Sequence, residues 1–165
     1  SPPLVSDVAG LTNALADSSI SRILVAPGHY ALSTELKIFR SVILDAAVPN
    51  SVVLDAQASS SSLRRVLKIM GSGIDVVLTG FNVTGGYTRT TNGGGIYVQA
   101  SGGSVVLSQL NVYSNTAIYR GGGIYIASGT ITLESCNIYQ NRALSGWVWA
   151  HSLKSLSMID SCRLT

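Results

Sequence analysis

The chain has 165 residues, enough for one domain, with 46% hydrophobic and 12% charged residues. Its net charge of +3 comes from 11 basic and 8 acidic side chains, and no basic run exceeds Arg64-Arg65, which argues against a nucleic-acid partner. Every apolar run falls far short of the roughly 20 residues that cross a bilayer, so we also expect no membrane span.

The first predicted element is a short amphipathic helix over residues 6–16, with Ser6 or Asp7 as its N-cap. Apolar residues recur there at helical spacing: Val5, Val8, Leu11 and Leu15. A solenoid needs a lid over its first coil, because an open end exposes core residues and an unpaired strand edge. We interpret the helix as that cap, although an ordinary surface helix has the same pattern.

From residue 23 onward the chain is a series of short apolar–any–apolar triplets, which predict strands. After Ile23-Leu24-Val25 they fall at 36–38, 42–44 and 52–54; 67–69, 76–78 and 81–83; 96–98, 105–107 and 110–112; 124–126, 131–133 and 136–138; and, in a degenerate last coil, 148–150, 157–159 and 162–164. The outer two residues of each triplet should point inward and the middle one outward. Three triplets per coil predict an all-β solenoid of about five coils, with three parallel sheets around one core.

Two stretches of the chain repeat each other closely. Gly93-Gly94-Gly95-Ile96-Tyr97-Val98 returns as Gly121-Gly122-Gly123-Ile124-Tyr125-Ile126. The interval from Gly93 to Gly121 is typical of a solenoid in which each repeat is one coil. We expect the glycines to form a tight entry to the strand, with a positive φ or a contact too close for a Cβ.

These repeats, GGGIYV…VVLSQLNVYSNTA…GGGIYI…ITLESCNIYQNRA, resemble the right-handed parallel β-helix proteins of the pectate-lyase-like superfamily. Within it they are most similar to the repeats of chlamydial polymorphic outer-membrane proteins, which carry a GGA-I motif and an F-x-x-N motif. Gly-Gly-Gly-Ile stands in place of the first motif, and Tyr113-Ser114-Asn115 and Tyr139-Gln140-Asn141 are loose relatives of the second. The resemblance implies a right-handed β-helix over nearly the whole chain, but this fold hosts lyases, hydrolases, adhesins and scaffolds.

We interpret residues 1–165 as a single β-helix domain, with the capping helix at 6–16, regular coils over 23–146 and a degenerate last coil at 147–165. The last coil stops inside a repeat without a polar cap, so we expect either a longer natural solenoid or a partner that covers this end. The candidate partner interface consists of Trp147, Trp149, Leu156, Ile159 and Leu164.

One outward row of side chains is the candidate binding site. It contains the middle residue of the first triplet in each coil, at about 4.8 Å per step: Lys37, Lys68, Tyr97, Tyr125 and Trp149. Flat aromatic rings suit the apolar faces of sugars, and two lysines would attract an acidic polysaccharide. Stacked aromatic residues also stabilise parallel sheets without any ligand, and this alternative stays open.

The catalytic residues of an enzyme are not visible in the sequence. The resemblance implies that lyases of the superfamily use carboxylates that hold Ca²⁺ and a basic residue, and that hydrolases use paired carboxylates. The outward row contains no Asp or Glu. Glu134 and Asp160 are spaced to lie one coil apart, and we interpret them as solvated surface acids rather than a cation site. Asp55, Arg64, Arg65 and Asp75 are expected near one loop, either as an ion-pair group or without a role.

We expect no metal and no cofactor, because neither His29 nor His151 has a second His or Cys at ligand spacing. Cys136 and Cys162 are spaced one coil apart at inward positions, where they stack either as buried thiols or as a disulfide. The sequence therefore favours a non-catalytic extracellular or cell-surface module for adhesion or carbohydrate contact, or a structural subunit. The alternatives are a polysaccharide lyase or glycoside hydrolase, and a scaffold subunit docked through its C-terminal end.

Overall fold

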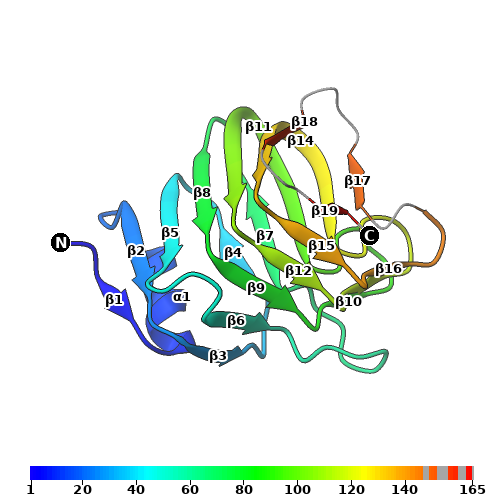
Figure 1. Cartoon of the computed structure of the whole chain (residues 1–165), viewed down its shortest axis with the longest axis horizontal. Helices are drawn as coiled ribbons and strands as arrows, with labels where there is room; N and C mark the ends of the chain where they lie inside the picture. Colours follow the sequence, from blue (N-terminus) through cyan, green and yellow to red (C-terminus); the bar gives the residue numbers. More distant parts are fainter. Residues whose placement is uncertain (147–148, 152–155, 160–162, 165) are drawn as a thin grey trace.

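Parallel strands wind around one apolar core in a solenoid of about four turns (Figure 1). The computed structural model describes residues 1–146, 149–151, 156–159 and 163–164, with side chains described as far as Gly146. Strands of successive turns lie side by side from the N-terminal end to the C-terminal end, and the described residues contain one short helix. No helix in this part of the chain has the length and apolar composition needed to cross a bilayer.

The largest sheet has ten strands and joins two of the predicted strand series. The first series is β4 (Leu36–Ile38), β7 (Leu67–Met70), the first parts of β11 (Ile96–Ser108) and β14 (Ile124–Glu134), and β17 (Trp149–His151). The second is β5 (Val42–Ala46), β8 (Asp75–Thr79), the second parts of β11 and β14, and β18 (Leu156–Ile159). It is preceded by the predicted strand β2 (Arg22–Val25) and by β1 (Leu4–Val5), which was not predicted. The expectation of two separate sheets is wrong, because β11 and β14 continue from one series into the other.

The six-stranded sheet corresponds to the third predicted series. Its strands are β3 (Gly28–Ala31), β6 (Val52–Asp55), β9 (Phe81–Thr84), β12 (Asn111–Tyr113), β15 (Asn137–Tyr139) and β19 (Arg163–Leu164). A three-stranded sheet closes the turn with β10 (Tyr87–Thr88), β13 (Thr116–Ala117) and β16 (Arg142–Ala143). The triplet pattern misses this last sheet, because strands of two residues are too short to show an alternation.

Helix α1 (Val8–Ala16) packs against the first strands of the solenoid. Its N-cap is Asp7, whose carboxylate accepts a hydrogen bond from the Gly10 N–H at 2.7 Å. Asp7 is one of the two predicted N-caps, and the helical residues therefore begin at Val8. Before it, Leu4–Val5 pair with β2 as strand β1. At the other end the Arg40 guanidinium donates to the carbonyls of Ala14, Leu15 and Ile20, which satisfies carbonyl groups left open at the helix end.

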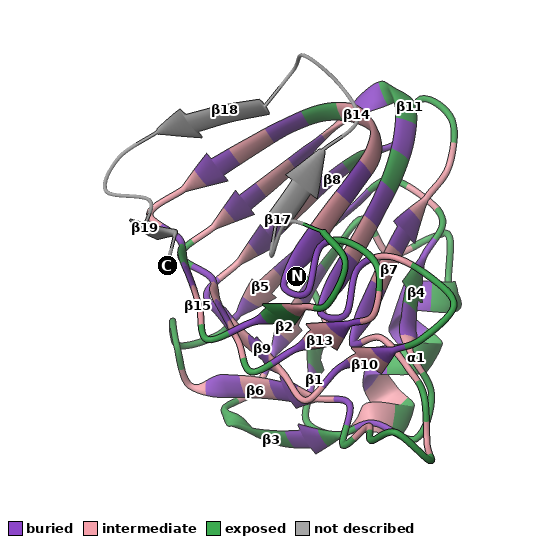
Figure 2. Ribbon diagram, turned by 90° about the vertical axis from the view of Figure 1, so that its right-hand side faces the viewer, coloured by how far each residue is buried: buried purple, intermediate pink, exposed green. Residues whose placement is uncertain are grey.

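The alternation along the strands agrees with the predicted register. Ile96, Val98, Ile124 and Ile126 are at most 5% exposed, whereas Tyr97 and Tyr125 between them are only half-buried. Figure 2 shows the same alternation of buried and more exposed residues along β8, β11 and β14. A slip of one residue would reverse this pattern, so the inward and outward faces are fixed over the regular coils.

The triple glycines also behave as predicted. Gly93 and Gly121 have φ angles of 75° and 65°, which residues with a Cβ adopt only with strain. The next glycine in each repeat approaches the following coil: a Cβ on Gly94 would lie 2.5 Å from the carbonyl oxygen of Gly122, and a Cβ on Gly122 would collide with that of Arg142. These repeats therefore require glycine for two separate reasons.

The register of the last coil differs from the prediction by one residue. Ala150 pairs with Tyr125, and Trp149 pairs with Ile124, so Trp149 does not continue the predicted outward row. Ala143 pairs with Ala117, and the connection from Ala143 to Trp149 is one residue shorter than the connection from Ala117 to Ile124. The shorter connection shifts the register by one.

The same shift carries into β18. Leu156 and Met158 pair with Ile131 and Leu133, whereas the predicted alignment places Ser157 and Ile159 opposite those two residues. Ile159, not Asp160, pairs with Glu134, so the predicted alignment of the two acids is wrong. The predicted register returns at β19, which contains Arg163 and Leu164.

Candidate functional site

Four of the five residues in the predicted outward row lie in register on neighbouring strands. Lys37 of β4 pairs with Lys68 of β7, Lys68 pairs with Tyr97 of β11, and Tyr97 pairs with Tyr125 of β14. Lys37 is exposed and the other three are half-buried. We call this surface the Lys–Tyr face. Its two cations and two phenols come from the same position in successive coils.

The two tyrosine rings of this face stack on each other, with centroids 5.8 Å apart and planes inclined by 20°. The Arg65 guanidinium lies over the Tyr97 ring, 4.7 Å from its centroid. Tyr97 is thus covered on one side by Arg65 and on the other by Tyr125. Both flat faces of the Tyr97 ring are therefore already in contact with protein groups. What this tyrosine offers is its hydroxyl, which donates to Gln99 Oε1 at 3.1 Å.

Arg65 ties three segments together at this point. Its Nη1 donates to Glu35 Oε2 at 3.2 Å, and its Nε donates to the carbonyl oxygen of Asn92 at 3.0 Å. The side chain is 11% exposed, so the guanidinium is held in place over Tyr97. No sequence pattern predicts this arrangement, because Glu35, Arg65 and Asn92 lie outside the repeated triplets, in connections of different lengths.

A pocket of about 460 Å³ opens next to Lys37. We call it the arginine pocket, because its basic lining residues are Lys37, Arg64, Arg65 and Arg89. Glu35 is the one acidic side chain among the residues that line it, and the remaining lining consists mostly of Ser and Thr. The pocket lies between the connection before β4, the segment before β7 and the segment after β10.

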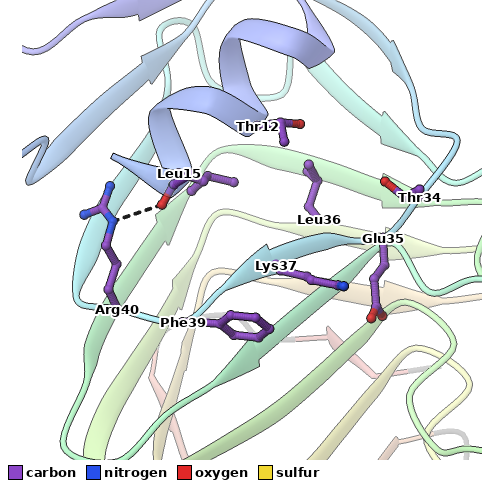
Figure 3. Close-up of a pocket in the computed structure, with 9 residues that line it drawn as sticks. Thr12, Leu15, Thr34, Glu35, Leu36, Lys37, Phe39 and Arg40 are labelled. Atoms are coloured by element: carbon purple, nitrogen blue, oxygen red, sulfur yellow. Dashed lines mark hydrogen bonds between the residues drawn. The ribbon is translucent and has the colours of Figure 1, made fainter. Parts of the chain in front are cut away.

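A second cavity, of about 490 Å³, lies between helix α1 and β4. Its apolar lining includes Leu15, Leu36 and Phe39, and it shares Glu35 and Lys37 with the arginine pocket. Figure 3 shows the Arg40 side chain reaching the Leu15 carbonyl at the helix end, with the Glu35 carboxylate directed away from the helix. The two cavities therefore adjoin along β4 and extend the Lys–Tyr face toward the N-terminal cap.

The ion-pair group expected from Asp55, Arg64, Arg65 and Asp75 does not form. Arg65 pairs with Glu35, and Arg64 Nη1 donates to the Ala56 carbonyl at 2.6 Å. Asp55 contacts His29 Nε2 at 2.9 Å, and Asp75 accepts a hydrogen bond from Ser104 Oγ at 2.9 Å. The acids are thus held elsewhere, and the basic residues stay beside the Lys–Tyr face.

A second tyrosine pair lies on the six-stranded sheet. Tyr113 and Tyr139 stack with centroids 5.3 Å apart, beside the aligned amides of Asn111 and Asn137. Burial of the phenol, together with the neighbouring Tyr139 and Asp55, raises the pKa of Tyr113 above its ordinary value. The outward residues aligned with the pair on β6 and β9 are Asp55 and Thr84, neither of which is a cation. This surface gives a natural comparison with the Lys–Tyr face, since it has the same aromatic stacking without the lysines.

The remaining predicted residues are placed only in part. Cys136 is buried and its Sγ donates to the Leu107 carbonyl at 3.1 Å, whereas Cys162 and Trp147 lie outside the described residues. Trp149, Leu156, Ile159 and Leu164 are described in backbone only, on β17, β18 and β19, so the C-terminal interface stays a prediction. Over the described part of the chain, no three His, Cys, Asp or Glu side chains gather as metal ligands would.

No protein-family model matches the chain, and no curated protein sequence matches it. Among solved structures, the chain is similar to the alginate lyase from Paenibacillus sp. str. FPU-7, with a TM-score of 0.51 and 16% identity over 83% of this chain. The chain spans 58% of the length of that protein. At this identity the similarity concerns the fold, and it places the chain among the parallel β-solenoids.

Proposed function

We propose that this chain is a right-handed parallel β-helix module of an extracellular or cell-surface protein, which binds an acidic polysaccharide on its Lys–Tyr face without cleaving it. The right-handed winding is supported by the strong general preference of parallel crossover connections for that hand, about 98% of cases. The observation that carries the binding proposal is the aligned row of Lys37, Lys68, Tyr97 and Tyr125, with Arg65 fixed above it.

The electrostatics of this surface favour a polyanion. The side chains of Lys37, Lys68 and Arg89 form no hydrogen bond or ion pair with another described residue, so their charges are not neutralised within the described structure. Elsewhere on the described surface, Asp45 is paired with Arg22 at 2.8 Å. Lys37 and Lys68, two unneutralised cations on adjacent strands about 4.8 Å apart, can meet a polymer that carries a negative charge on each sugar. Such binding weakens as salt is added, because the ammonium group of the exposed Lys37 and that of the half-buried Lys68 are screened by dissolved ions.

The tyrosines would contribute through their hydroxyl edges. Because Tyr97 is enclosed between Arg65 and Tyr125, its phenol oxygen, rather than its ring face, is the group that meets a sugar hydroxyl. The stacking also fixes the ring positions, so little side-chain freedom is lost when the ligand binds. The proposed surface therefore combines lysines that attract the polymer with stacked tyrosines that orient it.

Binding of alginate, a polyuronate, tests this proposal, with neutral dextran as the comparison ligand. We expect Lys37→Ala combined with Lys68→Ala to weaken alginate binding by roughly 5- to 30-fold, because each exposed charge contributes on the order of 1 kcal/mol. Tyr97→Phe combined with Tyr125→Phe should also weaken binding while the rings stay stacked.

The matched control is Tyr113→Phe combined with Tyr139→Phe, which removes two hydroxyls from the other tyrosine pair and should leave alginate binding unchanged. Equal binding of dextran and alginate by the wild-type chain would contradict the proposal. So would equal losses in the two tyrosine double variants.

A polysaccharide lyase is the second candidate, because the structural neighbour is an alginate lyase. A lyase that acts on a uronate needs a cation to neutralise the carboxylate and a base to take the proton beside it. The bond to the glycosidic oxygen then breaks as the double bond forms, and the leaving oxygen takes a proton from an acid or from water. Lys68, Arg65 and the Tyr97 hydroxyl are the groups on this face that fit those roles. Incubation with alginate and measurement of ultraviolet absorbance from the unsaturated product distinguish the lyase from the binding module.

A further inference from the structure

The arginine pocket has a composition that the row of lysines and tyrosines does not explain. It gathers four cationic side chains from three segments that are far apart in sequence: Lys37, Arg64, Arg65 and Arg89. Glu35 is the one acid among its lining residues, and its carboxylate is already paired with Arg65 at 3.2 Å. Four positive charges and one negative charge leave a net charge of +3 in a space of about 460 Å³.

Two of the guanidinium groups are fixed before any ligand arrives. Arg64 donates through Nη1 to the Ala56 carbonyl and through Nη2 to Ser62 Oγ. Arg65 donates to Glu35 and to the Asn92 carbonyl. Each guanidinium has five N–H donors, so both keep donors for a ligand after these bonds are made. Lys37 and Arg89 make no such bonds with another described residue and are available to close on an anion.

The number of cationic donors that line the pocket favours a tetrahedral anion over a planar one. A carboxylate has two oxygens in one plane and is matched by a single guanidinium fork. A sulfate or phosphate ester has three terminal oxygens that point in different directions, and it can accept from several cations at once. The hydroxyls of Thr34, Thr90 and Thr91, which also line the pocket, add neutral donors suited to the same oxygens.

We propose that the arginine pocket binds a tetrahedral oxyanion, and that the ligand of this module is therefore a polysaccharide that carries sulfate or phosphate esters. The polysaccharide part of this inference rests on the proposed function of the Lys–Tyr face, whereas the anion site stands on the pocket alone. Lys37 belongs to both surfaces, so an ester group in the pocket would lie at the N-terminal end of the row.

Isothermal titration calorimetry with sodium sulfate, sodium phosphate and sodium acetate at matched ionic strength tests the anion site. We expect sulfate or phosphate to bind at least tenfold more tightly than acetate. Lys37→Ala combined with Arg89→Ala should weaken binding of the preferred anion by about tenfold or more, because hydrogen bonds from charged donors are lost. Neither side chain forms a hydrogen bond with a described residue, so this variant should fold.

The matched control is Arg142→Ala, which removes an exposed cation from β16, outside the pocket, and should bind the anion as the wild type does. Acetate binding equal to that of both other anions, or unchanged anion binding in the pocket variant, would overturn the proposal. Stronger binding of sulfate indicates a sulfated polymer, and stronger binding of phosphate indicates a phosphorylated one.

Dextran sulfate, alginate and dextran separate this inference from the proposed function. Tighter binding of dextran sulfate than of alginate, lost in the pocket variant, supports the ester group. Equal binding of the two acidic polymers, lost in Lys68→Ala and retained in Arg89→Ala, would leave the proposed function standing and remove the anion pocket. Binding of dextran sulfate that is insensitive to substitutions of Lys68, Tyr97 and Tyr125 but sensitive to Arg89→Ala would support the anion pocket and contradict the proposed function of the Lys–Tyr face.

Discussion

Replacing Asn115 with alanine should destabilise the solenoid strongly, because this amide is bonded inside the core. Asn115 is fully buried, and its Nδ2 donates to the Val83 carbonyl at 3.1 Å and to Asn141 Oδ1 at 3.1 Å. Its Oδ1 accepts from the Gly86 N–H at 2.9 Å, and that bond is buried as well. The side chain thus joins three successive coils.

The cost follows from the groups left behind. A buried donor or acceptor without a partner costs about 1–3 kcal/mol, and the Asn115→Ala variant leaves the Gly86 N–H unpaired and weakens the bonding of two further groups. We expect a loss of about 3 kcal/mol in the free energy of unfolding. For a chain of this size that corresponds to a Tm lower by about 6–12 °C.

The matched control is Asn111→Ala on the outward row of asparagines. The Asn111 amide donates to Asn50 Oδ1 at 3.0 Å and to Asn82 Oδ1 at 2.9 Å, but the side chain is only half-buried and water can replace those bonds. Its loss should be less than about 1 kcal/mol. Thermal unfolding followed by circular dichroism measures both variants. Equal Tm shifts for Asn115→Ala and Asn111→Ala would refute the reasoning from buried unpaired groups.

Three further predictions concern stability, each measured by denaturant unfolding. Gly122→Val should lower the free energy of unfolding by more than about 3 kcal/mol, because the new Cβ would collide with the Arg142 carbonyl oxygen. Gly102→Ala, with open space around the methyl group, should cost about 1 kcal/mol for its φ of +71°. Similar losses of stability in the two variants would contradict this reasoning. Burial raises the pKa of the Tyr30 phenol in the folded chain, so this phenol ionises first in the unfolded chain, near pH 10. Its contribution to stability is therefore complete below that pH and is lost as the pH rises through the folded pKa. Tyr30→Phe should therefore flatten the alkaline decline, and an unchanged decline would count against it. Asp7→Ala removes the helix N-cap and should cost about 1 kcal/mol, a loss that Asp7→Asn should largely restore.

The regular coils were predictable because period-two alternation is a strong local signal. Each predicted triplet from 36–38 to 136–138 overlaps an observed strand, to within one residue at its start, and the outward row from Lys37 to Tyr125 follows from that register. The last coil was not predictable in the same way. A connection one residue shorter before Trp149 changes its register, and no local pattern reveals the length of a connection in space.

The surroundings of the site depend on contacts that sequence patterns do not record. Arg65 covers Tyr97 and pairs with Glu35, but Arg65 and Glu35 lie in connections where nothing repeats. The arginine pocket combines Lys37 and Arg89, which are far apart in the sequence, and only the folded coil brings them to one cavity. Repeats thus predicted the row of lysines and tyrosines, whereas the charge that surrounds it required the three-dimensional structure.

The most direct test of polysaccharide binding at the Lys–Tyr face is a titration of the isotope-labelled chain with an alginate oligosaccharide, followed by nuclear magnetic resonance. We expect backbone amide shifts to change on β4, β7 and the first parts of β11 and β14, around Lys68, Tyr97 and Tyr125. Amides beside Tyr113 and Tyr139 should stay unchanged. Shift changes confined to that second tyrosine pair, or no changes at all at millimolar oligosaccharide, would contradict binding at the Lys–Tyr face.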